Sequence, residues 1–317
     1  MNHLESSFTG KNAFWRYFIM LLAIFTATNT IGSVPLLIAL GIKISDDPEI
    51  IDRLSANSSD LSPLGLNDNI DLLILIFPFI IGLIAFVLLI KPLNERSLGF
   101  TINGTGTFRW NRFIIAALVW LILSTIYLFG SRQIDPSNFV LNNTSGTLIP
   151  LITISVLFIP FQASFEEILF RGYLMQGFTV LLRNRMFPLV ITSVLFGLMH
   201  SWNPEVEAFG FWKMMSQYIL FGLIFGIITI LDDGAEAAMG AHYANNAFLL
   251  VMNTTENSAL QSDAVFRQLN VYPWIELASL FMIGLVAILI FKVVFRWRNF
   301  SVLLANVEPG NQRVQVS

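Results

Sequence analysis

Two adjacent glutamates, Glu166 and Glu167, lie where carboxylates are energetically costly. The surrounding residues read SFEEILFRGYL from 164 to 174, and no charged residue occurs from 147 to 163. An ionisable side chain near the centre of a bilayer costs about 2.5–3.5 kcal/mol on insertion scales, so it usually faces a cavity or a partner. In a helix, Glu167 and Arg171 are spaced i,i+4 with the acid first, which favours an ion pair. Glu166 lies about 100° away around that helix and is available as a base.

The histidines favour a catalytic interpretation over a purely structural charge cluster, which is the alternative. Only three occur, and His3 lies in the N-terminal tail. His200 ends the apolar run VLFGLMH, four residues after Phe196, and His242 opens the run AHYANNAF, four residues before Asn246. Each pair therefore shares one face of a predicted membrane helix. Two such histidines, with buried carboxylates and an amide, indicate a functional site.

These residue types suit hydrolysis of a peptide bond without a protein nucleophile. A glutamate and a histidine that share a water molecule can deprotonate it for attack on a carbonyl. A second histidine and an asparagine amide can donate hydrogen bonds to the oxyanion that forms. Two histidines and a glutamate are also a zinc-protease ligand set, and this alternative stays open although H-E-x-x-H is absent. Serine and aspartyl proteases are disfavoured because G-x-S-x-G and an intramembrane Gly-x-Gly-Asp are absent.

The elements that carry these residues are predicted to be membrane helices. Of 317 residues, 55% are hydrophobic and only 12% are charged, and the mean hydropathy is +0.69. The apolar runs predict an all-α integral membrane bundle of about eight transmembrane helices, near 14–42, 72–90, 113–130, 149–176, 186–202, 214–231, 234–253 and 274–296. Residues 1–317 are interpreted as one membrane domain with a catalytic core over 150–253. The net charge of −3 gives no case for nucleic-acid binding, and the absence of cysteine excludes thiolate chemistry.

The distribution of Lys and Arg predicts the orientation in the membrane. With eight spans, twelve of these residues lie on the side of the termini and five on the other, with Arg171 left out as intramembrane. Positive residues concentrate on the cytoplasmic side. Both termini are therefore predicted to be cytoplasmic, with loops 43–71 and 254–273 outside.

Three motifs occur in order: E-E-x-x-x-R at 166–171, F-x-x-x-H at 196–200 and H-x-x-x-N at 242–246. Together they resemble the CPBP family of Abi or CAAX-protease-like intramembrane glutamic endopeptidases, which is related to the prenyl-protein protease Rce1. The resemblance covers about 150–253 and implies a metal-independent site, with no cofactor, in a bundle cavity that opens toward the cytoplasmic side. It implies these roles: Glu166 and His200 activate water, His242 and Asn246 form the oxyanion pocket, and Glu167, Arg171 and Phe196 support the site.

The expected partner is a protein or peptide substrate in or at the lipid bilayer, most consistent with a bacterial plasma membrane. Neither the residues nor the motifs specify the substrate or whether it is prenylated. A non-catalytic membrane protein, such as a bacteriocin-immunity factor or scaffold, remains an alternative. So does a transporter, since buried Glu, Arg and His also mark proton and substrate pathways.

Overall fold

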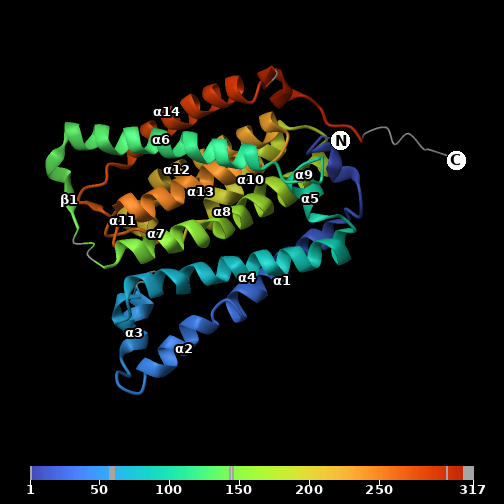
Figure 1. The fold of residues 1–317 in the computed structure, drawn as a ribbon. Helices are drawn as coiled ribbons and strands as arrows, with labels where there is room; N and C mark the ends of the chain where they lie inside the picture. Colours follow the sequence, from blue (N-terminus) through green and yellow to red (C-terminus); the bar gives the residue numbers. More distant parts are fainter. Residues whose placement is uncertain (1, 57–60, 143, 145, 298, 310–317) are drawn as a thin grey trace.

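The fold is an all-α bundle with one small sheet (Figure 1). The computed structural model describes residues 2–56, 61–142, 144, 146–297 and 299–309, so residues 57–60 of the predicted acidic loop lie outside it. Its α-helices are α1 Phe14–Thr30, α2 Val34–Lys43, α3 Ile50–Ala56, α4 Asp68–Asn94, α5 Leu98–Ile102, α6 Trp110–Ile134, α7 Leu148–Leu157, α8 Ile159–Glu167, α9 Met175–Leu182, α10 Met186–Met199, α11 Pro204–Phe209, α12 Phe211–Asp232, α13 Glu236–Met252 and α14 Pro273–Val294. Strands β1 (Phe139–Leu141), β3 (Phe266–Gln268) and β2 (Asn253–Thr254) pair in that order, β1 antiparallel and β2 parallel to β3.

Each of the eight predicted membrane segments coincides with helical structure. Among the described residues, six helical segments are long and apolar enough to cross a bilayer: Phe14–Lys43, Asp68–Asn94, Trp110–Ile134, Leu148–Leu182, Phe211–Asp232 and Pro273–Val294. The other two segments are α10, with 14 residues, and α13, with 17. The all-α membrane bundle is thus confirmed, while the count of eight spanning helices stays a prediction.

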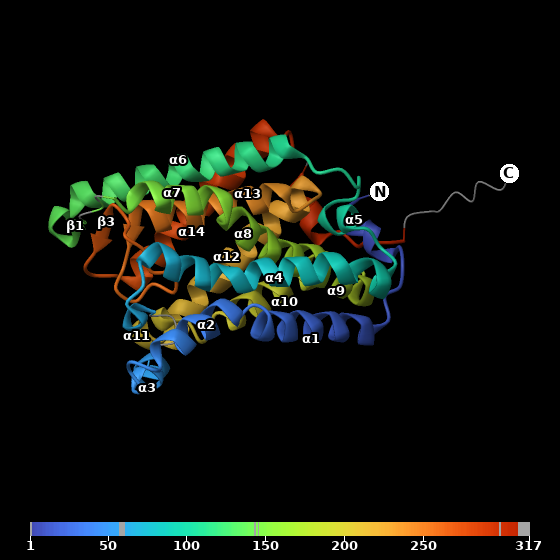
Figure 2. The ribbon, with the colours of Figure 1, turned by 60° about the horizontal axis from the view of Figure 1, so that its bottom comes forward.

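The bundle has two distinct ends. The first described residues and the segment 299–309 lie at one end, here called the terminal end, and β1, β3 and α11 lie at the opposite end, here called the loop end (Figures 1 and 2). Exposed tryptophans mark both: Trp15 and Trp110 at the terminal end, and Trp202, Trp212 and Trp274 at the loop end. Tryptophan concentrates at the two membrane–water interfaces. The long axis of the bundle therefore corresponds to the membrane normal.

Helix α13 lies in the bundle interior because its side chains are small. Its alanines Ala237, Ala238 and Ala241 are fully buried. A Cβ on Gly240 would lie only 2.1 Å from the backbone oxygen of Phe113 on α6. Small residues let helices approach this closely in lipid. The Gly- and Ala-rich helix therefore occupies the bundle interior.

Buried charges hold the start of α13 at the terminal end. Arg109 donates from Nη2 to Oε2 of Glu236 at 2.6 Å and from Nε to Oε1 at 3.0 Å. It also donates from Nη1 to the backbone oxygen of Asp232 at 2.8 Å, and Trp297 donates from Nε1 to the carboxylate of Asp232 at 2.8 Å. This bidentate geometry is the strong form of an ion pair. The cluster of Arg109, Asp232, Glu236 and Trp297 joins α6, α12, α13 and the segment after α14.

A π-helix, Ile168–Leu174, follows the two glutamates and interrupts the helix that runs from α8 into α9. A π-turn displaces a backbone carbonyl from the regular helical pattern. His3 donates from Nε2 to the carbonyl oxygen of Arg171 at 3.0 Å. The other ring nitrogen of His3, Nδ1, lies 3.3 Å from Nε2 of Gln176. The prediction that His3 belongs to a tail is wrong, since its side chain is buried against the π-helix.

We predict that His3 makes stability depend on pH. Burial lowers the pKa of the His3 imidazole. The unfolded chain has a histidine pKa of about 6.5, so as pH falls it binds a proton at His3 more readily than the folded protein does. The contribution is present above that pH and is lost as pH falls below it. Thermal unfolding in detergent at pH 5 to 8 should show this fall, and His3→Gln should flatten it. An unchanged profile in His3→Gln would contradict this role.

Candidate active site

Glu167 is the centre of the buried charge cluster. Its Oε1 accepts from Nη1 of Arg171 at 3.1 Å and from Nδ1 of His242 at 2.8 Å, and all three side chains are buried. Arg171 also donates from Nη2 to the carbonyl oxygen of Gly222 at 3.2 Å and lies over the ring of Phe196 at 4.3 Å. The predicted pair of Glu167 and Arg171 is present, and it also contacts α10, α12 and α13.

Glu166 lies near the same His242 ring and has one unpartnered oxygen. Its Oε1 accepts from Nε2 of Gln162 at 2.6 Å, one helical turn earlier. Its Oε2 is buried and has no hydrogen-bond partner among the described residues, since His242 Nε2 lies 3.7 Å away. Buried carboxylate oxygens normally have a partner, and a polar cavity commonly supplies a water molecule. Glu166 therefore offers a free carboxylate oxygen to a water.

His242 and Asn246 form a second hydrogen-bonded unit on α13. The amide nitrogen of Asn246 lies 3.2 Å from His242 Nε2 and donates to Oε1 of Gln162 at 3.0 Å. An amide nitrogen only donates, so Nε2 of His242 accepts and its Nδ1 carries the proton given to Glu167. Asn245 donates to Oδ1 of Asn246 at 3.0 Å, which orients that amide. Contacts with Gln162 and Glu167 on α8 and with Asn245 on α13 thus position the His242–Asn246 unit.

His200 stands at the C-terminal end of α10 with one basic nitrogen free of the helix. Its Nδ1 lies 2.7 Å from the carbonyl oxygen of Phe196, so Nδ1 donates and Nε2 is the basic nitrogen of the neutral ring. The ring stacks on Tyr218 of α12, with centroids 4.5 Å apart and planes 19° apart. The hydroxyl of Tyr218 accepts from Asn203 at 3.0 Å. Stacking and hydrogen bonding together hold the imidazole in one orientation.

A single cavity of about 460 Å³ brings these side chains together. It is lined by four residues from the predicted catalytic set, Glu166, His200, His242 and Asn246, and also by Phe196. Glu167 and Arg171, the two residues expected to support the site, do not line the cavity and are buried behind its wall. Among the described residues, no group of three or more His, Asp and Glu side chains is arranged to hold a metal ion.

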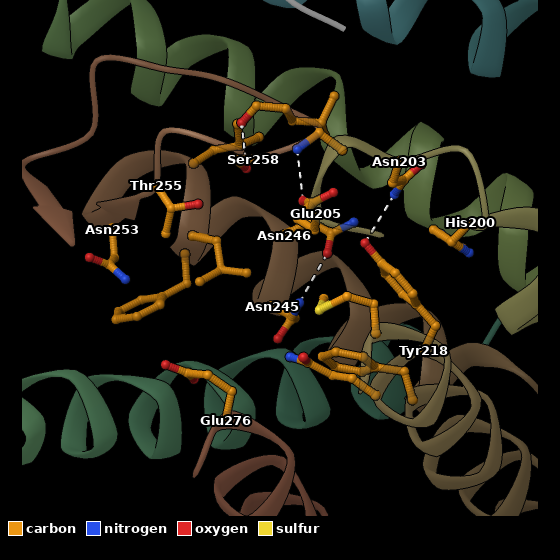
Figure 3. A pocket seen from close by; sticks show the side chains of 18 of the residues that line it. His200, Asn203, Glu205, Tyr218, Asn245, Asn246, Asn253, Thr255, Ser258 and Glu276 are labelled. Atoms are coloured by element: carbon orange, nitrogen blue, oxygen red, sulfur yellow. Dashed lines mark hydrogen bonds between the residues drawn. The ribbon is translucent and has the colours of Figure 1, made fainter. Parts of the chain in front are cut away.

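Three residues of the site were not anticipated from the sequence: Gln162, Glu205 and Tyr218. Gln162 had a detectable signal, because a glutamine four residues before Glu166 shares its helical face. Tyr218 and Glu205 had no such signal in the sequence. Their helices, α12 and α11, are brought to the cavity by the turn that follows His200, which is a feature of the tertiary structure. Figure 3 shows Asn203, Glu205 and Tyr218 beside His200.

The cavity lies toward the loop end. Its outer wall includes Asn253, Thr255 and Ser258 after α13, and Glu276 at the start of α14 (Figure 3). The first described residues and the segment 299–309 lie at the opposite end (Figure 1). Cytoplasmic termini and a cavity open toward the cytoplasm were both expected, and this geometry does not allow both expectations to hold.

Comparison with known proteins supports the motif interpretation. Residues 145–248, which include all three motifs, match the family model described as type II CAAX prenyl endopeptidase Rce1-like. The resemblance to the CPBP family is confirmed, and the match indicates a CAAX-type protease that is integral to the membrane. The chain is also 27% identical over 260 residues to Uncharacterized protein YyaK of Bacillus subtilis (strain 168), which covers 81% of this chain and 84% of that protein. No solved structure matches the chain.

We predict that breaking the Glu167–Arg171 pair destabilises the protein. Glu167→Gln leaves the guanidinium without its carboxylate, and Arg171→Met leaves a carboxylate with only His242. Loss of one partner of a buried pair typically costs about 3–5 kcal/mol. Thermal unfolding and folded yield in detergent should fall for both variants. The exposed acid Glu207 provides the matched control, since Glu207→Gln removes one charge outside the bundle interior. Wild-type stability in both single variants would show that the pair is dispensable.

Proposed function

We propose that the protein is a metal-independent glutamic endopeptidase that hydrolyses a peptide bond within the membrane bundle. The observation that carries this proposal is the unpartnered Oε2 of Glu166, buried in a wall of the cavity that His200 also lines. A carboxylate oxygen and a basic imidazole nitrogen facing one cavity can hold a water molecule and remove its proton. The family match over 145–248 supports peptide-bond hydrolysis as the reaction class.

The proposed mechanism uses Glu166 as base and then as acid. Glu166 Oε2 takes a proton from the water, with His200 Nε2 as the second contact, and the hydroxide attacks the carbonyl carbon. The resulting oxyanion accepts a hydrogen bond from the amide of Asn246. A second hydrogen bond comes from Nε2 of His242 when the ring carries a proton on both nitrogens before the reaction; Nε2 then no longer accepts from Asn246, and Nδ1 still donates to Glu167. Glu166 then passes its proton to the departing amine as the C–N bond breaks.

The hydrogen bonds of the site also bear on the zinc alternative. His242 uses both nitrogens for protein partners, Glu167 and Asn246. A zinc ion on Nε2 would have to displace the Asn246 amide, while the Nδ1 contact with Glu167 could remain. The contact between His242 and Asn246 favours the proposal that Glu166, His200, His242 and Asn246 act directly, without a cofactor.

We predict that Glu166→Gln abolishes turnover and leaves the fold intact. Glutamine keeps an oxygen that accepts from Gln162 but has no basicity. Asn246→Ala should be milder, since loss of one oxyanion donor typically costs about 10²–10³ in rate. Comparative peptidomics of cells that carry either form identifies the cleaved products, and purified protein then supplies the rates. Full cellular function with Glu166→Gln would favour a non-catalytic scaffold, and substrate flux across vesicles in place of cleavage would favour a transporter.

We also predict that activity survives removal of metal ions. Purified protein dialysed against a strong chelator should keep its rate and contain no stoichiometric zinc by elemental analysis. Loss of activity on chelation, with recovery on addition of zinc, would overturn the glutamic mechanism. Glu166→Gln treated in the same way provides the background rate.

A further inference from the structure

The cavity wall is negatively charged and has no positive side chain to balance it. Three carboxylates line it, Glu166, Glu205 and Glu276, and no lysine or arginine does so among the described residues. Glu276 is held by the hydroxyl of Tyr127 at 2.8 Å and the amide of Gln268 at 3.2 Å, which are neutral donors. The negative charge of the wall is therefore available to a ligand.

Glu205 is the carboxylate best placed to contact such a ligand. Its Oε1 accepts from the backbone nitrogen of Ala259 at 2.8 Å, which fixes the side chain. Its Oε2 is buried without a hydrogen bond among the described residues, and the carboxylate also interacts with the hydroxyl of Tyr218. It lies beside Tyr218, whose ring stacks on His200 (Figure 3). Burial raises the pKa of the Glu205 carboxyl, so a bound cation would offset the cost of ionising it.

The charges of the whole molecule are separated along the bundle axis. The loop-end segments 43–71, 131–147, 200–213 and 253–276 contain thirteen Asp and Glu against five Lys and Arg. The remaining segments outside the membrane helices hold the termini and carry the excess of Lys and Arg. Positive residues concentrate on the cytoplasmic side, so the loop end and the mouth of the cavity face away from the cytoplasm. An acidic mouth also attracts cationic ligands from a distance.

We infer that the cavity takes, from the non-cytoplasmic face, a peptide segment that carries a lysine or arginine near the bond to be cut, and that Glu205 binds that side chain. This inference rests on the proposed peptidase function. It also disfavours a substrate whose free C-terminal carboxylate must lie in the cavity, because no lysine or arginine in the described lining would pair with that carboxylate. Glu205 is then a residue that determines specificity rather than one that performs the chemistry.

Binding to the Glu166→Gln protein tests the charge preference without requiring cleavage. The probes are three fluorescent ten-residue peptides of alanine and leucine that differ only in a central Lys, Gln or Glu, measured by fluorescence anisotropy in nanodiscs. The Lys peptide should bind roughly tenfold tighter than the Gln peptide, the usual scale of one charge-assisted contact. Glu205→Gln in this background should bring the ratio close to one, and Glu205→Lys should favour the Glu peptide.

Glu207→Gln is the matched control, since Glu207 is an exposed acid two residues along α11 and its substitution removes the same charge. It should keep the preference for the Lys peptide. Equal binding of the Lys and Gln peptides, or equal effects of Glu205→Gln and Glu207→Gln, would overturn the role of Glu205. A preserved preference for Lys with no cleavage by the wild-type protein would instead reject the peptidase function alone.

Cysteine labelling tests the face, because the chain has no cysteine of its own. Ser258→Cys lies in the cavity wall, and Ala13→Cys is exposed at the terminal end. A membrane-impermeant maleimide applied to intact cells should label Ser258→Cys, and should label Ala13→Cys only after permeabilisation. The reverse pattern would place the mouth of the cavity in the cytoplasm and overturn entry from the outer face.

Discussion

The arrangement of the site depends on one buried carboxylate, that of Glu167. A lone charge in a low-dielectric interior is costly, and Glu167 offsets that cost by accepting from both Arg171 and His242. Arg171 in turn contacts Phe196 and the backbone of Gly222. The three motifs are therefore one interaction network, in which the supporting acid sets the tautomer and position of the histidine in the cavity. Glu166 has no cationic partner of this kind, and this asymmetry distinguishes the paired carboxylate of Glu167 from the one proposed to activate water.

The backbone that follows these glutamates departs from a regular α-helix, and a hydrogen bond from His3 accompanies that departure. The π-helix at Ile168–Leu174 includes Arg171, and the carbonyl oxygen of Arg171 accepts from His3. The N-terminal segment thus satisfies a backbone group that a regular helix would satisfy itself. Single π-turns inside α-helices occur frequently at functional sites. Within this π-helix, Arg171 donates to the carbonyl oxygen of Gly222 on α12 and also pairs with Glu167.

Charge is arranged on two scales in this protein. Locally, two guanidinium groups pair with buried carboxylates, Arg109 with Glu236 and Arg171 with Glu167. Globally, the loop end is acidic and the terminal end is basic. The cavity belongs to the acidic end, and its own lining repeats that sign. This acidic lining is the basis of the proposal that the pocket takes cationic peptide segments.

The sequence by itself determined the membrane bundle, the spacing of Glu167 and Arg171, and the membership of Glu166, His200, His242 and Asn246 in one set. The bundle and the Glu167–Arg171 spacing follow from hydropathy and helical periodicity, which act over a few turns of a single helix. The set of four residues was indicated by their chemistry and by the resemblance of the three ordered motifs to a known family. Only the tertiary structure decided that Glu167 also holds His242, that His3 is buried, and that Gln162, Tyr218 and Glu205 reach the site. Those contacts join residues from different helices, and their geometry depends on how closely small residues such as Gly222 and Gly240 let the helices approach.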